Sequence, residues 1–280
     1  MTADLAVVVP TNRPAAAVAR CLEGLLAQEG PRLEVAIVDD GSPEPDELGR
    51  LARPGVAVLR AGGGVSAARN AGVAATSAPV VAFTDDDCVP EPGWADALLQ
   101  AIGGWDDAVA VGHVVNGVPD NPYAAAGQLV HDLVHAYYDG ADGRPAVAAA
   151  NNLAIPRTLL ERAGGFETAI RFGEDRELCA RLVAVGATFV RAPAAVVRHE
   201  KRLDAAGYVR QYFGYGRGAY RFHTGGDGRV RGTAGFYRSL PGAVRGQPPR
   251  TLALLGLWQA ANAAGFAYEA AAGAASRLRG

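Results

Sequence analysis

Three consecutive acids, Asp85, Asp86 and Asp87, directly follow the apolar run SAPVVAFT, which is typical of a buried strand. Adjacent carboxylates repel one another, so either water surrounds them or a cation neutralises them. Their oxygen atoms suit Mn²⁺ or Mg²⁺, which bind one or two carboxylates while substrate phosphates complete the coordination shell. On an extended segment Asp85 and Asp87 would face one way and Asp86 the other. The sequence predicts a metal site here, with a solvated acidic loop as the alternative.

A second acidic pair, Glu174 and Asp175, follows Gly173 at the start of a predicted helix at 174–185. Carboxylates at this end of a helix interact favourably with its dipole, so a simple capping pair is the structural alternative. A carboxylate that reaches an acceptor hydroxyl can instead serve as a general base. His199 ends a predicted strand and would be a natural further ligand beside a metal, although a lone histidine is more often structural.

Polar residues lie at the carboxyl ends of the first two predicted strands. Thr11, Asn12 and Arg13 follow the strand at 5–10, and Asp39 and Asp40 end the strand at 33–40. In doubly wound sheets, ligands bind at the carboxyl ends of the strands, where these residues would lie. Gly64 opens the next predicted helix, and Arg69 follows about one turn later. Glycine allows close backbone approach and arginine suits phosphate, but a flexible turn with a surface arginine is the alternative.

The elements that must position these residues alternate regularly. Continuous apolar runs and helical periodicities follow one another, which indicates strands covered by helices on both faces, an α/β fold. After about residue 200 the pattern changes to Gly, Tyr and Arg and ends in an apolar, Ala-rich helix at 251–273. We therefore predict a main domain at 1–200, with halves at 1–105 and 106–200, and a helical C-terminal extension at 201–280.

Composition excludes several classes of protein. A formal net charge of −2 argues against a nucleic-acid-binding protein held by a basic field. Three distant cysteines and no signal-peptide pattern indicate a cytoplasmic protein with free thiols. Polar residues interrupt the 251–273 helix, so it is predicted to pack on its own domain, on a partner or peripherally on the inner membrane face rather than span a bilayer. A homo-oligomer is left open.

Common catalytic and nucleotide-binding motifs are absent. The chain has neither a G-x-x-x-x-G-K-[ST] loop nor a G-x-S-x-G elbow. The segment AGGGVSAARNAG lacks the G-x-G-x-x-G spacing and follows the third strand rather than the first. P-loop and dinucleotide-binding readings are therefore disfavoured.

Together, the segments resemble the family 2 nucleotide-sugar glycosyltransferases of GT-A fold. The likeness runs from about residue 5 to residue 200 through VVVPTNRP, IVDDGS, GGGVSAARNAG, FTDDDCVPEPGW and FGEDRELCARL, in the family's order. It implies a Rossmann-like fold with a mostly parallel central sheet. It also implies inverting transfer from a nucleotide-diphosphate donor, a UDP-sugar first, to a hydroxyl acceptor such as a cell-envelope, lipid-linked or natural-product glycan.

The resemblance also implies roles for individual residues. Asp175 would be the catalytic base, with Glu174 beside it to orient the acceptor. Asp87, together with Asp85 and His199, would hold Mn²⁺ or Mg²⁺. The residues implied at the nucleotide are Pro10, Thr11, Asn12, Arg13, Asp39, Asp40, Gly64, Arg69, Asp85 and Asp86.

Two rival functions are weighed against this one. A nucleotidyltransferase of the same fold would need a glycine-rich, basic first turn, which PTNRPAAA does not provide. A non-catalytic module that only binds a sugar nucleotide would not need both Asp87 and Asp175.

Overall fold

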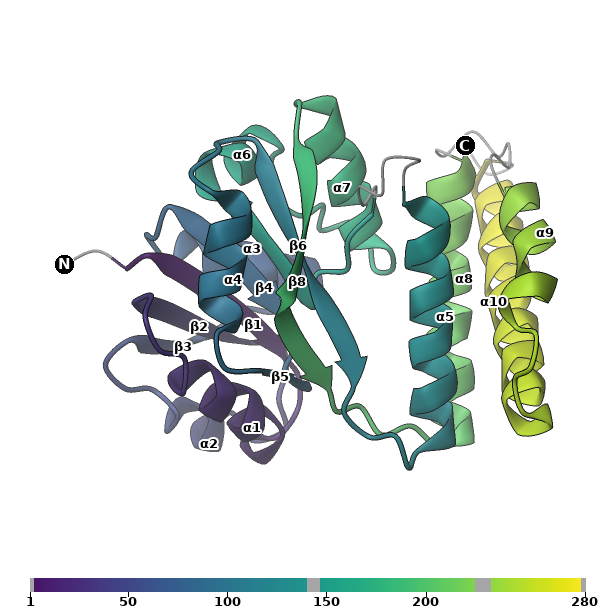
Figure 1. Ribbon diagram of the computed structural model, residues 1–280, viewed down its shortest axis with the longest axis horizontal. Coiled ribbons are helices and arrows are strands. Elements are labelled where there is room, and N and C mark those ends of the chain that lie inside the picture. Colours follow the sequence, from purple (N-terminus) through teal and green to yellow (C-terminus); the bar gives the residue numbers. More distant parts are fainter. Residues whose placement is uncertain (1–2, 140–146, 225–232, 278–280) are drawn as a thin grey trace. The chain divides into compact units, whose positions relative to one another are not determined.

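The computed structural model describes residues 3–139, 147–224 and 233–277, in two compact units (Figure 1). The first unit comprises Met1–Gly117 and Tyr138–Lys201, and the second comprises Val118–Tyr137 and Arg202–Gly280. Residues 118–137 thus cluster with the C-terminal helices, so the segment predicted as the acceptor-binding half, 106–200, is divided between the two units.

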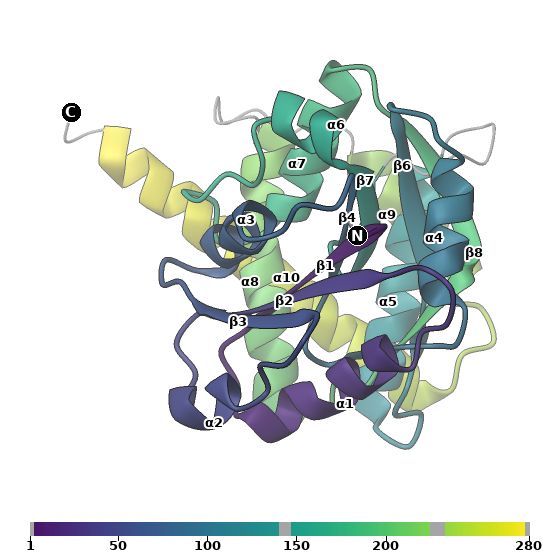
Figure 2. The same ribbon diagram turned by 90° about the vertical axis from the view of Figure 1, so that its left-hand side faces the viewer.

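A mixed eight-stranded sheet forms the centre of the first unit, in the order β3-β2-β1-β4-β7-β6-β8-β5 (Figure 2). The strands are β1 (Leu5–Thr11), β2 (Leu33–Asp39), β3 (Val56–Arg60), β4 (Val80–Thr84), β5 (Cys88–Pro90), β6 (Ala108–Asn116), β7 (Asn152–Pro156) and β8 (Thr188–His199). The first four strands are mutually parallel, and β8 is parallel to β6. The β4–β7, β6–β7 and β5–β8 pairs are antiparallel.

Helices cover both faces of this sheet. They are α1 (Ala15–Leu26), α2 (Pro45–Gly49), α3 (Val65–Ala74), α4 (Trp94–Ile102), α6 (Arg157–Arg162) and α7 (Glu174–Ala184). Val7 and Val9 of β1 join one apolar cluster with α1 and α4, whereas Val8 joins a second cluster with α3, α6 and α7. Burial on both faces explains why this strand is a continuous apolar run.

Two strand predictions differ from the structure. The predicted strand at 79–87 ends at Thr84, because Asp85–Asp87 turn the chain into the short strand β5. The backbone N–H of Cys88 donates to the carbonyl of Asp85 across this turn, at 3.0 Å. Apolar patterning predicts two short strands, at 187–191 and 195–199, but the structure has one strand, β8, whose register with β6 shifts between Gly112 and His113. Register shifts of this kind leave no clear signal in apolar patterning.

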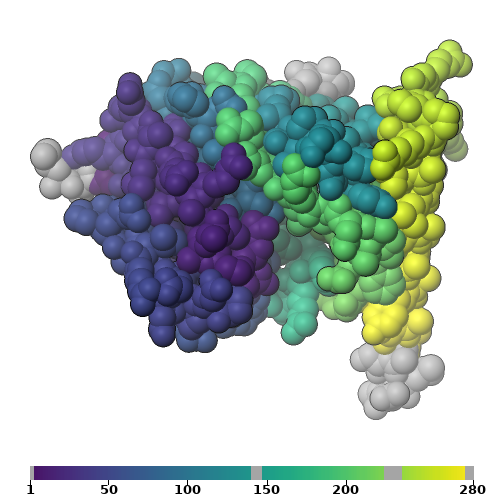
Figure 3. All heavy atoms as spheres, turned by 90° about the horizontal axis from the view of Figure 1, so that it is seen from below, coloured from purple at the N-terminus to yellow at the C-terminus, as the bar shows by residue number. Residues whose placement is uncertain are grey.

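The second unit is helical. Its elements are α5 (Pro122–Tyr138), α8 (Ala205–Thr224), α9 (Thr233–Ala243) and α10 (Pro249–Arg277). Tyr208, Tyr212 and Trp258 are buried in its apolar core. The atoms of α10, coloured yellow, run as a continuous ridge in the space-filling view (Figure 3). The helix predicted at 251–273 lies within α10 and packs on α8 of the same unit.

Among the helices that the structure describes, none combines the length and apolarity needed to cross a membrane.

Candidate functional site

The acid turn, Asp85–Asp87, lies at the carboxyl ends of two neighbouring strands. Strands β1 and β4 are parallel partners, so Thr11 at the end of β1 comes close to the turn that follows β4. The Thr11 hydroxyl donates a hydrogen bond to Asp86 Oδ2 at 2.5 Å, and both side chains are buried. Burial, together with repulsion from Asp87, raises the pKa of Asp86 despite this hydrogen bond.

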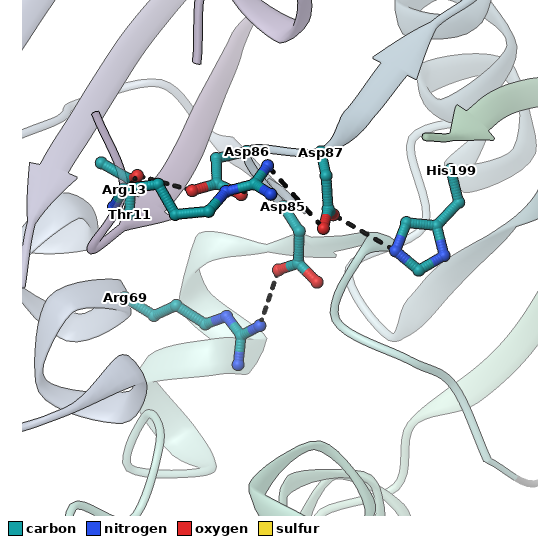
Figure 4. A network of polar contacts seen from close by, with 7 residues as sticks. All are labelled: Thr11, Arg13, Arg69, Asp85, Asp86, Asp87 and His199. Atoms are coloured by element: carbon teal, nitrogen blue, oxygen red, sulfur yellow. Dashed lines mark hydrogen bonds and ion pairs between the residues drawn. The ribbon is translucent and has the colours of Figure 1, made fainter. Parts of the chain in front are cut away.

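Arg13 lies against two of the three acids (Figure 4). Its Nη2 atom is 3.0 Å from Asp86 Oδ1 and 3.8 Å from Asp87 Oδ2. Asp85 pairs with a different guanidinium group. The expected extended segment is wrong: Asp86 and Asp87 lie in a turn, so the alternation of a strand does not apply, and Asp86 is directed to Thr11 and Arg13.

Asp87 also pairs with His199. Strand β5 pairs with β8 so that Cys88 lies opposite His199, which brings His199 Nε2 to 3.2 Å from Asp87 Oδ1 (Figure 4). Burial by itself would raise the pKa of Asp87. The hydrogen bond to His199 and the charges of His199, Lys201 and Arg13 outweigh that effect and lower the pKa to about 2. Asp87 is therefore an ionised carboxylate at neutral pH.

These donors fit a divalent metal ion. One ligand atom each from Asp87, Cys88 and His199 lies within 4.8 Å of the others. A carboxylate oxygen suits Mn²⁺, and histidine is the commonest metal-binding side chain. Cys88 does not suit this ion, because burial raises the pKa of its thiol and keeps it neutral. Sequence reasoning missed Lys201, whose charge helps to lower the pKa of Asp87 and whose position two residues after His199 was the signal that could have found it.

Arg69 joins the acid turn to the start of α7. Its side chain is only 5% exposed, with Nη2 at 3.1 Å from Asp85 Oδ1 and Nη1 at 2.8 Å from Glu174 Oε1. Burial would lower the pKa of Arg69, but the charges of Asp85 and Glu174 outweigh it and raise the pKa. The family resemblance implied a nucleotide contact for Arg69, and the alternative was a surface arginine. The structure buries Arg69 and directs both terminal nitrogen atoms to carboxylates (Figure 4 shows the Asp85 contact).

The two acids at the start of α7 have different surroundings. Burial and the neighbouring charge of Asp175 raise the pKa of Glu174, which Arg69 already engages. Asp175 Oδ1 accepts a hydrogen bond from the backbone N–H of Arg176 at 2.8 Å. Asp175 is partly exposed, so its carboxylate can be approached from solvent.

The second acidic corner follows β2. Asp39 Oδ1 accepts backbone hydrogen bonds from Gly41 at 2.9 Å and Ser42 at 2.5 Å. Asp40 Oδ1 accepts one from Gly64 at 2.9 Å, which ties this corner to the start of α3. Gly64 has a φ of 96°, which favours glycine. The structure thus brings the β2 corner and the entry of α3 together, next to β1, while Asn12 is exposed at the end of β1.

Comparison with known proteins assigns the chain to a family. The family model described as glycosyl transferase family 2 matches residues 6–162. The chain belongs to this family. A pre-mycofactocin glycosyltransferase of Mycobacterium tuberculosis is 30% identical over 229 residues, which cover 77% of this chain and 47% of that protein. The glycosyltransferase AglE of Haloferax volcanii is 25% identical over 206 residues, which cover 71% of this chain and 67% of that protein. This family 2 chain thus spans about half the length of the first of these relatives.

Solved structures confirm the GT-A fold. The mannosyltransferase PcManGT from Pyrobaculum calidifontis, in complex with GDP-Man and Mn²⁺, matches with a TM-score of 0.62 and 20% identity, covering 99% of this chain and 81% of that one. The structure of GalNAc-T7 with UDP, GalNAc and Mn²⁺ matches with a TM-score of 0.56 and 14% identity. The match covers 80% of this chain and 52% of that one. At these identities the likeness shows the fold alone.

Proposed function

We propose that this family 2 protein transfers a sugar from a nucleotide-diphosphate donor to a hydroxyl acceptor, with inversion at the anomeric carbon. The observation that carries the proposal is the bridge made by Arg69. This buried guanidinium contacts Asp85 of the acid turn and Glu174 at the start of α7. It therefore joins a carboxylate cluster suited to a metal with a carboxylate pair suited to proton transfer.

The donor side comprises the strand ends. Asp87 and His199 would hold Mn²⁺ or Mg²⁺, with Asp85 close to the ribose or the metal. The metal would supply charge that stabilises the departing diphosphate. The β2 corner, Asp39 and Asp40, and the exposed end of β1 would bind the nucleoside. This placement agrees with the general rule that ligands of open α/β sheets bind at the carboxyl ends of strands.

The acceptor side is the start of α7. Asp175 would take the proton of the acceptor hydroxyl, because Glu174 is already engaged by Arg69 whereas Asp175 is partly exposed. Glu174 would orient the acceptor beside Asp175. A single base and a single leaving group suffice for one direct displacement, which inverts the configuration of the sugar.

The nucleotide of the donor is the open question within this proposal. UDP is our first choice from the sequence resemblance, and GalNAc-T7 was solved with UDP and Mn²⁺. PcManGT, which covers more of this chain, was solved with GDP-Man and Mn²⁺. Both nucleotides are therefore tested.

Calorimetric titration of UDP, GDP and dTDP, with and without Mn²⁺, is the first experiment. We expect one nucleotide to bind in a metal-dependent manner and Asp87→Asn to abolish that dependence. Asp106→Asn, an exposed carboxylate changed in the same way, is the matched control and should bind like wild type. If no nucleotide binds in a metal-dependent manner, and Asp87→Asn behaves like wild type, the acid turn does not serve as the metal site of the donor.

Asp175→Asn separates catalysis from binding. We expect this variant to retain metal-dependent nucleotide binding but to transfer sugar about 100-fold more slowly or worse. Transfer is measured as release of the nucleoside diphosphate from donor sugars that carry the nucleotide found to bind, with a panel of acceptors. Full transfer by Asp175→Asn would remove Asp175 from the role of base. Donor binding without any transfer by wild type across the panel would favour the non-catalytic module.

A further inference from the structure

Arg13 occupies a position beside the acid turn where a cation is needed. Its Nη2 atom contacts both Asp86, at 3.0 Å, and Asp87, at 3.8 Å. The contact is built into the end of β1, because the backbone N–H of Arg13 donates to the Thr11 hydroxyl at 3.1 Å, and the same hydroxyl donates to Asp86. Figure 4 shows the guanidinium group extended across Asp86 toward Asp87.

The two arginines of the site differ in how firmly they are held. Arg69 is 5% exposed and has a carboxylate on each terminal nitrogen. The Arg13 side chain is 37% exposed, and its Nε atom has no hydrogen-bond partner in the described part of the chain. The two carboxylates are only 11% and 9% exposed, whereas the guanidinium side chain reaches solvent, so Arg13 can move away without becoming a buried, unpaired charge. Arg13 is thus the cation that can leave the acid turn.

The single negative charge of Asp87 cannot fully neutralise both a divalent metal ion and the guanidinium group of Arg13, so the two cations would repel one another in this partly buried site. The diphosphate of a nucleotide would offer Arg13 a different anion. Guanidinium groups bind phosphate oxygens in a bidentate manner that suits them well.

We propose that Arg13 acts as a stand-in cation that competes with the divalent metal for Asp87, and that the nucleotide diphosphate relieves this competition by drawing Arg13 away. The inference rests on the proposed function, because it takes Asp87 as a metal ligand. Its consequence is coupled binding. The metal binds weakly alone and more tightly when nucleotide is bound, and the metal must tighten nucleotide binding by the same factor. Arg13 is here a positioning residue that couples the binding of the metal to that of the nucleotide.

Removing the charge of Arg13 separates its competition with the metal from its contact with the nucleotide phosphates. In Arg13→Gln, Mn²⁺ alone should bind about threefold to tenfold more tightly, because its competitor is gone. Nucleotide should bind more weakly in the presence of Mn²⁺, because its phosphates lose a guanidinium partner. The factor by which nucleotide tightens Mn²⁺ binding should fall accordingly. Arg13→Lys, which keeps the charge, should remain close to wild type for Mn²⁺ alone.

The experiment is titration of the full chain with Mn²⁺, read from the electron paramagnetic resonance signal of the free ion, with and without UDP or GDP. Arg32→Gln is the matched control. Arg32 pairs with Asp4 at 3.0 Å just before β2 and β1 begin, so the change removes the same charge and one ion pair in the same unit, at the opposite strand ends from the acid turn. The part of the Mn²⁺ binding that is lost in Asp87→Asn is the binding at this site.

Each outcome decides between the claims. Tighter Mn²⁺ binding and weaker coupling in Arg13→Gln, but not in Arg32→Gln, support the inference. Unchanged or weaker Mn²⁺ binding in Arg13→Gln overturns it while the proposed function stands, provided that wild type binds Mn²⁺ and Asp87→Asn does not. An equal gain in Arg32→Gln also overturns it, because the effect would then be one of net charge. Absence of Mn²⁺ binding by wild type with either nucleotide defeats the proposed metal site itself.

Discussion

At the scale of residues, the site depends on how a few charges are shared. Arg69 and Glu174 are 105 residues apart in the chain, and their 2.8 Å contact connects the two sides of the proposed reaction. The guanidinium group also lies over the ring of Phe166, with 5.2 Å to the ring centroid. Buried charges of this kind are tolerated only when they are paired, so the pair has a structural as well as a functional role.

Replacing Arg69 should expose that structural role. Arg69→Met leaves Glu174 largely buried without its counter-charge, and we expect the free energy of unfolding in urea to fall by about 2–4 kcal/mol. Adding Glu174→Gln should recover part of the loss, because the uncompensated charge is then removed. Arg50→Met, at an arginine whose side chain is 72% exposed, is the control and should change stability little. An Arg69→Met protein as stable as wild type would contradict the pairing.

At the scale of elements, close packing of α8 on α10 stands out in the second unit. A Cβ atom on Gly265 would lie 1.9 Å from the carbonyl oxygen of Phe213, and one on Gly216 would lie 2.0 Å from that of Asn262. Neither contact is sterically allowed, and the obstructing atoms are backbone. Glycine at these two positions therefore sets the distance between the helix axes. Near one end of the same interface, Arg217 and Arg221 pair with Glu269.

Gly265→Ala should force α8 and α10 apart. We expect it to lower the free energy of unfolding by about 1–3 kcal/mol or more, as overpacking does, despite alanine's better helix propensity. Gly256→Ala on the same helix is the matched control: its added Cβ meets nothing within 4 Å, so it should stabilise slightly. The measurement is thermal and urea unfolding followed by circular dichroism. If both substitutions raise the free energy of unfolding equally, the close packing of α8 on α10 at Gly265 is contradicted.

At the scale of the whole molecule, the chain leaves the first unit and returns to it. Helix α5 belongs mainly to the second unit, although it lies between two segments of the first in sequence. Ala126 and Val130 of α5 are buried in a cluster with Tyr208, Tyr212 and Trp258. The 1–200 segment predicted as a main domain therefore contains a helix whose apolar face is covered by residues beyond it.

A chain cut after Lys201 should reveal this dependence. It keeps α5 but loses the residues that cover Val130, so we expect it to aggregate or to bind a hydrophobic dye, because exposed apolar patches promote both. The same truncation with Val130→Gln and Val134→Gln should be more soluble, whereas these two changes should destabilise the full chain. Light scattering and dye fluorescence measure the effect. A soluble, dye-free 1–201 chain would show that α5 does not need the C-terminal helices.

Much of the first unit could be predicted because its signals are local. Continuous apolar runs marked the strands of the central sheet, and their ends located the polar clusters, since a strand buried on both faces has no other place for charge. Whether neighbouring strands run parallel or antiparallel could not be predicted in the same way. The antiparallel β7 is as apolar as the parallel strands, so its burial pattern is the same.

The sequence by itself determined the family resemblance, the GT-A fold and the residue types at the strand ends, because each depends on neighbours within a few positions. Only the tertiary structure decided which charges meet. The acid turn placed Asp86 and Asp87 against Arg13 and Asp85 against Arg69, and the pairing of β5 with β8 placed His199 beside Asp87. These contacts act over a few ångströms between segments remote in sequence, so they exist only once the strands and helices have packed.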